Sequence, residues 1–241
     1  MITLDNVSKT FRSFKAIEDV SFTVHEGEVF ALLGPNGSGK TTTMKAMVGL
    51  VVPTSGQVIV HGINMRDNPE GARRFVSYLP QRLVFPDNLT AREVLRFYAE
   101  IRNLPQRVAD EAVRSAQFNG FSDRWVGEFS GGMIQRLGLA VTALPDVPVM
   151  VLDEPTANLD PVGVKRFREF VKDQKSKART IVFSSHLLAE VEDLADRVAI
   201  FVGGKVVALA SVEELRRTFS ERKTIEDLYL YYVRNYDDHR T

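Results

Sequence analysis

The spacing of hydrophobic residues changes twice along the chain and divides it into three regions. The first 65 residues contain short apolar runs bounded by glycine and proline, which is typical of strands joined by turns. Residues 88–144 repeat apolar positions at helical spacing, and from Val149 onward apolar strands alternate with helices. This alternation predicts a largely parallel sheet with helices on its faces. The strands expected in the first region are Ile2–Leu4, Val20–Val24, Val29–Leu33 and Gln57–Val60.

The middle region predicts three helices. The sequence Thr90–Glu93 is a capping box, and it opens a helix that runs to about Asn103. A second helix is expected over Gln106–Phe118, and a third begins after Gly132 and ends near Pro145. These helices form a block that we expect to be inserted between two halves of one sheet.

The last region predicts the second half of that sheet. A capping box over Ser211–Glu214 then opens a short helix, and a possible helical stripe around Leu228–Val233 marks an extension over residues 216–241. The elements expected before it are strands Val149–Leu152, Thr180–Ser184, Val198–Val202 and Lys205–Ala210, with helices Pro161–Lys175 and Leu187–Ala195.

The segment Gly34–Thr41 fits G-x-x-x-x-G-K-[ST], the phosphate-binding loop of nucleotide triphosphatases. Its glycines let consecutive backbone N–H groups turn around a phosphate, Lys40 adds a charge for the outer phosphates, and the hydroxyl of Thr41 can reach Mg²⁺. The alternative is a glycine-rich turn without a ligand. The strand Val29–Leu33 before the loop and the helix expected over Thr42–Leu50 after it argue against that alternative.

Three other strands end in side chains suited to the same chemistry. Asp153 follows a buried strand, where it would hold the metal, and Glu154 comes next, where it could accept a proton from the attacking water or orient it. His186 follows the strand Thr180–Ser184 and is suited to the γ-phosphate. Gln81 follows a strand expected over Phe75–Leu79 and is suited to the metal or the attacking water. Each residue alone has a plainer interpretation as polar surface or an acidic turn, and the phosphate loop favours the catalytic one.

A second glycine pair lies in the middle region. Ser130 reads as the N-cap of a helix that begins with Gly131 and Gly132, which makes a second potential anion site. A chain with one phosphate loop has no need of a second phosphate cradle, unless it serves a nucleotide held by another copy. A capped helix after a glycine turn is the alternative that spacing alone leaves open.

Composition narrows the class of protein. The chain of 241 residues is 44% hydrophobic, with 31 basic and 31 acidic residues, so no overall charge favours nucleic acid or an anionic membrane. It has no cysteine, which excludes disulfides and thiol chemistry. The sequence shows neither an export signal nor an apolar run of membrane-spanning length, so we expect a cytoplasmic protein whose membrane role, if any, comes through a partner.

These motifs, in this order and over about residues 1–215, resemble the ATP-binding cassette (ABC) family. The resemblance implies an α/β fold: a P-loop NTPase core with an N-terminal antiparallel β subdomain and an inserted α-helical subdomain at about residues 82–145. It also implies ATP and Mg²⁺ as cofactors. The implied nucleotide-binding residues are Phe11, Gly34, Pro35, Asn36, Gly37, Ser38, Gly39, Lys40, Thr41, Thr42, Ser130, Gly131 and Gly132.

The resemblance assigns further roles residue by residue. Glu154, His186, Gln81 and Lys40 are expected in catalysis, and Thr41, Gln81 and Asp153 at the metal. The segment Phe129–Gln135 looks like the family's signature motif, although Met133 and Phe129 stand where Gln and Leu are common. The stretch 157–160 looks like the D-loop, and Asp160 before Pro161 is also predicted as an ordinary helix N-cap. Phe11 takes the position of an adenine-stacking aromatic, and the alternative is a core residue of the first strand pair.

The family's mechanism implies two kinds of partner. A second copy of the chain would sandwich ATP head to tail, and an integral membrane transporter subunit would dock near Gln81, for which Val84–Pro86 is the candidate surface. The chain would then be peripheral on the inner face of the cell membrane. The alternative for Val84–Pro86 is local packing under the helical block. No nucleic acid is expected as a partner.

A narrower resemblance concerns ABC-2-type exporters. The segments 129–140 and 224–232 look like those of the ATPase of the exporter that helps mature the copper sites of nitrous oxide reductase. A soluble ABC ATPase acting as a nucleotide-gated clamp on nucleic acid or ribosomes is the alternative, and the balanced charge counts against it. A small-molecule kinase would not explain Glu154 or the signature helix.

Overall fold

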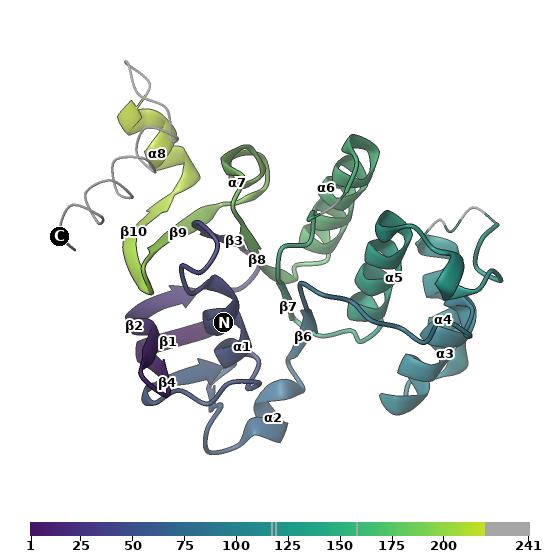
Figure 1. Cartoon of the computed structure of the whole chain (residues 1–241), viewed down its shortest axis with the longest axis horizontal. Coiled ribbons are helices and arrows are strands. Elements are labelled where there is room, and N and C mark those ends of the chain that lie inside the picture. The colour runs from purple at the N-terminus through teal and green to yellow at the C-terminus, as the bar shows by residue number, and fades with distance from the viewer. Residues whose placement is uncertain (117, 119, 158, 220–241) are drawn as a thin grey trace.

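Two sheets and a separate group of helices make up the computed structural model, which describes residues 1–116, 118, 120–157 and 159–219 (Figure 1). The larger sheet has six strands in the order β10-β9-β3-β8-β7-β6. Five of these strands run parallel, and β10 pairs antiparallel with β9 at the edge. The strands are β3 (Val29–Leu33), β6 (Val76–Leu79), β7 (Val149–Leu152), β8 (Thr180–Ser185), β9 (Arg197–Val202) and β10 (Lys205–Ser211).

Both faces of the six-stranded sheet are covered, which explains why β3 and β7 are apolar at every position and why all residues of β3, β7 and β8 are buried. Phe30 and Leu32 of β3 pack into a cluster shared with α1 and the smaller sheet. Val29, Ala31 and Leu33 pack on the opposite face with α6 and α7. The helices are α1 (Lys40–Met47), α6 (Pro161–Ser176), α7 (Leu188–Leu194) and α8 (Val212–Phe219).

The smaller sheet is antiparallel and has the strand order β2-β1-β4-β5. Its first two strands are much longer than the sequence pattern predicted. Register shifts interrupt the β1–β2 pairing at several points, and each shift breaks the alternation of apolar and polar residues from which a strand is recognised. The strands are β1 (Ile2–Phe11), β2 (Phe14–Val24), β4 (Ser55–Val60) and β5 (Ile63–Asn64).

The middle helices build their own apolar cluster, which includes Phe85, Leu95, Phe118 and Leu137. The capping box that opens α3 is confirmed: the Glu93 amide donates to Thr90 Oγ1, and Glu93 Oε2 accepts from the Thr90 amide. The second helix ends at Ser115, earlier than predicted. The elements are α3 (Ala91–Ile101), α4 (Gln106–Ser115), the short 3₁₀ turn η1 (Val126–Glu128) and α5 (Gly131–Ala143).

Three short elements were not predicted, because a segment of a few residues is too short to show a repeat of apolar positions. These are β5, η1 and the five-residue helix α2 (Pro69–Arg73). The predicted caps at Asp160 and Ser211 are present, since each side chain accepts from a backbone amide three residues on. The predicted C-terminal stripe lies outside the described residues. Among the helices that are described, none combines the length and hydropathy needed to cross a bilayer.

Candidate functional site

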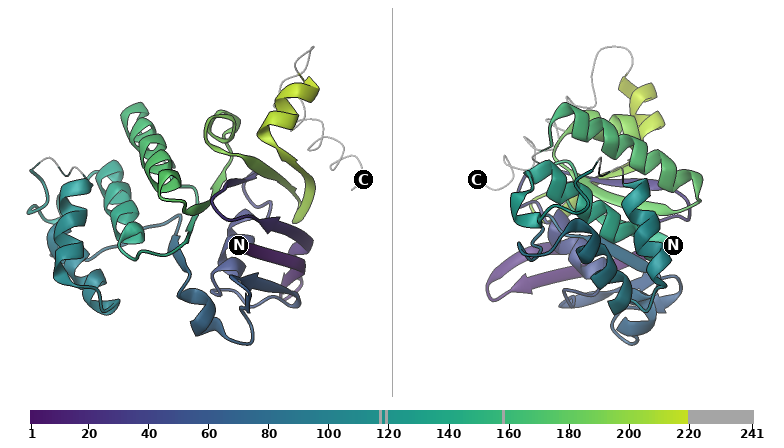
Figure 2. Two further views of the ribbon diagram at one scale, coloured as in Figure 1. Left: turned by 180° about the vertical axis from the view of Figure 1, so that it is seen from behind. Right: turned by 90° about the vertical axis from the view of Figure 1, so that its right-hand side faces the viewer.

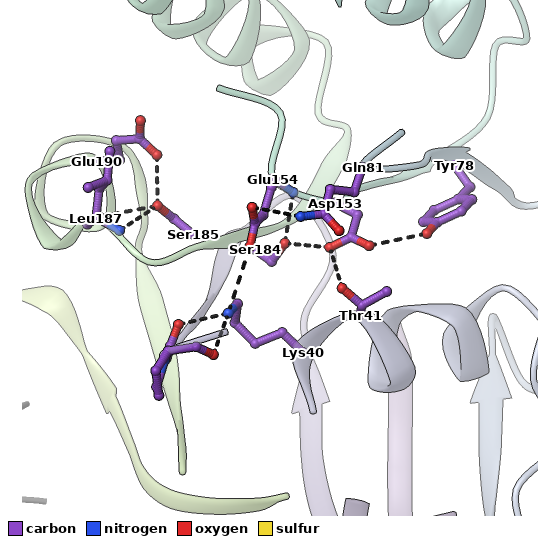
Figure 3. A network of polar contacts seen from close by, with 12 residues as sticks. Lys40, Thr41, Tyr78, Gln81, Asp153, Glu154, Ser184, Ser185, Leu187 and Glu190 are labelled. Carbon is purple, nitrogen blue, oxygen red and sulfur yellow. Dashed lines mark hydrogen bonds and ion pairs between the residues drawn. The ribbon is translucent and has the colours of Figure 1, made fainter. Parts of the chain in front are cut away.

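Four strands bring the predicted catalytic residues to one edge of the large sheet. The phosphate loop follows β3, Gln81 follows β6, Asp153 follows β7 and His186 follows β8. Since these strands are parallel and adjacent in the sheet, their carboxyl ends lie together. Figure 3 shows the polar contacts that connect residues from these strand ends.

The phosphate loop depends on its glycines in two ways. Gly37 and Gly39 have φ values of 79° and 104°, in the left-handed region that favours glycine. Gly34 packs closely: a Cβ there would collide with the carbonyl oxygen of Phe201 and lie 2.7 Å from Ser38 Oγ. The Ser38 hydroxyl is buried and has no hydrogen-bond partner within the described part of the protein. A polar atom without a partner inside an anion-binding loop fits a phosphate ligand.

Lys40 opens α1 and turns its ammonium back toward the loop. Its Nζ donates to the carbonyl oxygens of Gly34 at 2.7 Å and Pro35 at 3.0 Å, and lies 3.9 Å from Glu154 Oε1. Burial lowers the pKa of Lys40, and the nearby charges of Glu154 and Asp153 oppose that shift. The first turn of α1 contains no acidic residue, so the helix N-terminus is open to an anion.

Asp153 is fully buried and lies among three hydroxyl groups. Thr41 Oγ1 donates to Asp153 Oδ1 at 3.1 Å, Ser184 Oγ donates to the same oxygen at 2.8 Å, and the Tyr78 hydroxyl donates to Oδ2 at 3.4 Å (Figure 3). Burial raises the pKa of the Asp153 carboxyl, while these hydrogen bonds lower it. Hydroxyl and carboxylate oxygens side by side are the ligands that Mg²⁺ prefers, so Thr41 and Asp153 fit this ion.

Glu154 points from the same strand end toward Lys40 and Gln81. Its Oε2 accepts from Gln81 Nε2 at 3.0 Å. The Glu154 backbone has a φ of 46°, which is unusual for a residue with a Cβ and is a form of local strain found at functional sites. Gln81 therefore contacts the predicted base through its amide nitrogen. Its predicted contact with the metal stays a prediction.

Two predicted residues lie outside this network. His186 is exposed, directly after β8. Its turn is held by Ser185, whose hydroxyl accepts from the Leu187 amide at 2.9 Å and donates to the buried Glu190 at 2.8 Å.

Phe11 lies at the tip of the β1–β2 hairpin, where it is 45% exposed and Lys9 Nζ lies 5.0 Å from its ring centroid. It is therefore not a core residue of the first strand pair.

The second predicted phosphate cradle is separated from the first. Ser130 is the N-cap of α5, and its Oγ accepts from the Met133 amide at 3.4 Å. A Cβ on Gly131 would meet nothing within 4 Å, so the start of this helix is open. Phe129 packs against the ring of Phe121, which accounts for an aromatic residue at that position. Figures 1 and 2 show α5 well apart from α1, so the two cradles do not meet within one chain.

A buried hydrogen bond connects α5 to the segment that follows β7. Gln135 Nε2 donates to the carbonyl oxygen of Pro155, which follows Glu154, at 2.6 Å. A cavity of about 480 Å³ lies between α5 and α6, and Gly132, Gln135 and Phe167 are among its lining residues. No residue of the phosphate loop lines that cavity, so it is distinct from the phosphate loop and meets the second predicted cradle at Gly132.

Comparison with known proteins decides the family. The model of the family described as ABC transporter matches residues 17–157. The chain belongs to the ABC transporter ATPase family. It is 36% identical over 228 residues to the bacitracin transport ATP-binding protein BcrA of Bacillus licheniformis, covering 94% of this chain and 74% of that protein. It is 31% identical over 229 residues to the lantibiotic transport ATP-binding protein SrtF of Streptococcus pyogenes, covering 95% and 96% of the two chains.

Solved structures agree with this assignment. A structure described as the ATP binding subunit of an ABC transporter superposes with a TM-score of 0.86 at 30% identity and covers 96% of this chain and 98% of its own. The ATP-binding cassette MJ0796, solved as a dimer in a post-hydrolysis state with ADP and Pi, gives a TM-score of 0.81 at 24% identity, covering 88% and 99%. The solved structures therefore confirm the predicted fold class, and the family match confirms the predicted ATPase activity.

The structure adds two residues that the sequence did not single out. Ser184 and Tyr78 both donate to Asp153, although each lies inside a strand predicted for its apolar neighbours. The only sequence signal was a polar group near the carboxyl end of an apolar strand.

The structure also corrects the docking surface: Val84 is 75% exposed, but Phe85 is only 8% exposed and belongs to the helical cluster. A large apolar side chain beside Val84 is buried because α3 packs over it.

Proposed function

We propose that ATP binds along residues 34–42, with Lys40 against the outer phosphates and Mg²⁺ held by Thr41 and Asp153. The observation that carries this proposal is the placement of Thr41 Oγ1 3.1 Å from Asp153 Oδ1, beside the buried ammonium of Lys40. When bound, Mg²⁺ would neutralise phosphate charge and orient the outer phosphates for attack. Gln81 follows β6, the strand next to β7. It would complete the metal site by exchanging its hydrogen bond to Glu154 for a contact with Mg²⁺.

Glu154 is the proposed base. Its carboxylate accepts from Gln81 and lies 3.9 Å from Lys40 Nζ, so two side chains orient it toward the phosphate loop. A carboxylate in this position accepts a proton from the attacking water or holds that water in line. His186, at the next strand end, is the proposed donor to the γ-phosphate. Its exposure in the single chain leaves the imidazole accessible to a nucleotide.

A second copy of the chain completes the proposed site. Ser130, Gly131 and Gly132 form an open helix N-terminus that suits a phosphate, but α5 lies apart from the phosphate loop of the same chain (Figure 2). In a head-to-tail pair, this end of α5 would contact the nucleotide of the partner. Phe11, exposed at the hairpin tip, is the proposed stacking surface for adenine.

The proposed transport role requires a surface for a membrane subunit. Val84, Phe97 and Ile101 are 75%, 50% and 60% exposed, and Phe97 and Ile101 are one turn apart on α3. Aromatic contacts lead from Phe85 through Tyr98 to Phe97, which connects this surface to the segment after Gln81. We define Val84, Phe97 and Ile101 as the docking surface and place the chain on the inner face of the cell membrane.

Export is the proposed direction because the sequence resembles ABC-2-type exporters. The names of two relatives describe transport of bacitracin and of a lantibiotic. A role in maturing the copper sites of nitrous oxide reductase rests on sequence resemblance in segments 129–140 and 224–232, of which the second lies outside the described residues. Deleting the gene should then leave that enzyme without copper while its polypeptide is still made. Normal copper content would remove this cargo from consideration.

Glu154→Gln tests the hydrolytic site. The substitution keeps the shape of the side chain and removes the base, so ATP binding should persist while ATP turnover falls about a hundredfold or more. Glu128→Gln, the same change at an exposed residue of η1, is the control and should hydrolyse ATP at the wild-type rate. Wild-type turnover by Glu154→Gln would show that another group activates the water.

A further inference from the structure

The side chain of Ser184 lies between the two carboxylate residues of the site. Its hydroxyl donates to Asp153 Oδ1 at 2.8 Å and accepts from the main-chain amide of Glu154 at 2.8 Å (Figure 3). Ser184 has no exposed surface, so water cannot replace either bond without rearrangement. One hydroxyl thus connects the side chain of the proposed metal ligand to the backbone of the proposed base.

The position of Ser184 in the sheet explains this arrangement. Strand β8 lies between β3, which leads into the phosphate loop, and β7, which leads into Asp153. The β7–β8 ladder ends at Leu152 opposite Phe183, so Ser184 is the first residue of β8 beyond it. On its other side, Ser184 still pairs with Leu32 of β3. The Ser184 hydroxyl therefore connects β8 to Asp153 and Glu154, at the point where the segment after β7 leaves the sheet.

The bond to Glu154 is made where the backbone is strained. Glu154 has a φ of 46°, a conformation that a residue with a Cβ keeps only when its surroundings hold it. Its amide donates to Ser184, and its carboxylate accepts from Gln81. Without the Ser184 hydroxyl, the amide of Glu154 would be buried without this partner, and the peptide between Asp153 and Glu154 would lose a constraint on its orientation.

We propose that Ser184 is a positioning residue for ATP hydrolysis. Its hydroxyl aims the Asp153 carboxylate at the metal and fixes the Glu154 main chain so that the carboxylate of that residue faces the nucleotide. Ser184 acts through these two residues and touches neither substrate nor metal. The inference rests on the roles proposed above for Asp153 and Glu154.

Three substitutions distinguish the effect of the Ser184 hydrogen bonds from the effect of side-chain size. Ser184→Ala removes the hydroxyl, Ser184→Cys keeps a side chain of similar size that hydrogen-bonds weakly, and Ser184→Thr keeps the hydroxyl. We expect kcat to fall about ten- to a hundredfold in the alanine and cysteine variants, and the Mg²⁺ concentration for half-maximal activity to rise. The threonine variant should recover most of the activity. Binding of a fluorescent ATP analogue in EDTA should match wild type in all three, because the phosphate loop is untouched.

Ser77→Ala is the matched control. Ser77 is also buried, in the strand next to β7, but its hydroxyl has no hydrogen-bond partner among the described residues. This variant should keep wild-type kcat and Mg²⁺ requirement. The inference is wrong if Ser184→Ala and Ser184→Cys behave like Ser77→Ala, if Ser184→Thr is as impaired as Ser184→Ala, or if Ser184→Ala loses analogue binding in EDTA.

Two reference variants distinguish a wrong role for Ser184 from a wrong assignment of the hydrolytic site. Asp153→Asn and Glu154→Gln are assayed beside the serine variants. If both reference variants lose hydrolysis while Ser184→Ala retains it, only the role of Ser184 is refuted. If the reference variants retain hydrolysis, the proposed site itself is refuted.

Discussion

Replacing Asp153 by asparagine tests whether the buried carboxylate that would bind the metal lowers the unfolding free energy of the protein. The Asp153 side chain is fully buried, and burial raises the pKa of its carboxyl. Hydrogen bonds from Ser184, Thr41 and Tyr78 offset part of that rise, and the neighbouring charge of Glu154 adds to it. Without a cation, the ionised carboxylate is an incompletely compensated buried charge. Asparagine keeps the shape and the Oδ1 acceptor but has no charge, so Asp153→Asn should stabilise the nucleotide-free protein.

The expected gain in unfolding free energy is about 1–2 kcal/mol, in the lower part of the range for replacing buried ionic groups. For a chain of this size that gain corresponds to a rise in Tm of about 2–8 °C. The folded-state pKa of Asp153 lies above the ordinary value of 3.8, so the folded protein takes up the proton first as the pH falls. The advantage of the variant should be largest above the folded-state pKa of Asp153 and shrink as the pH is lowered through that pKa toward 3.8.

Thermal unfolding followed by circular dichroism in EDTA, at neutral and lower pH, measures both quantities, and Mg²⁺-dependent ATP hydrolysis is assayed in parallel. Asp160→Asn is the control, because it makes the same chemical change at an exposed N-cap and should alter stability by less than about 0.5 kcal/mol. The reasoning is refuted if Asp153→Asn is less stable than wild type at neutral pH, or if its advantage does not change with pH.

Three further predictions concern the loop and the docking surface. Lys40→Met should weaken ATP binding about ten- to a hundredfold, as expected for a charged hydrogen bond, and calorimetry showing unchanged affinity would contradict the assignment of the loop. Gly34→Ala should lower the unfolding free energy by about 1–3 kcal/mol because of its collision with Phe201, whereas Gly131→Ala, which meets nothing within 4 Å, should not lower it in the same urea titration. Val84→Asp should abolish co-purification with a membrane subunit without changing Tm, and retained co-purification would exclude this surface.

Local sequence patterns predicted the parts of the structure that depend on near neighbours in the chain. The strand–loop–helix around Gly34–Thr41 was predicted because its glycines and its apolar flanks are adjacent. The caps at Thr90 and Asp160 were predicted because each contacts a backbone amide three residues away. The large sheet was predicted because its strands, buried on both faces, carry continuous apolar runs such as Val29–Leu33, Val149–Leu152 and Ile181–Phe183.

The contacts that join distant residues were not predictable in the same way. Ser184 and Asp153 are 31 residues apart in sequence, and Tyr78 and Asp153 are 75 apart, so only the strand order brings them together. For Phe85 the sequence left a contact surface and packing under the helical block open, because a loop position does not show whether a helix will cover it. The structure confirms packing for this residue. The length of β1 and β2 was underestimated because register shifts break their alternation.

Measuring the mass of Glu154→Gln by light scattering with saturating ATP and Mg²⁺ tests the central claim most directly. A variant that binds ATP without hydrolysing it should accumulate as a pair of chains, because each nucleotide would be held by the Lys40 loop of one copy and Ser130 of the other. Adding Ser130→Arg to the same variant should restore the mass of a single chain. A single chain in Glu154→Gln at saturating ATP, or a pair that persists with Ser130→Arg, would contradict a site completed by a second copy.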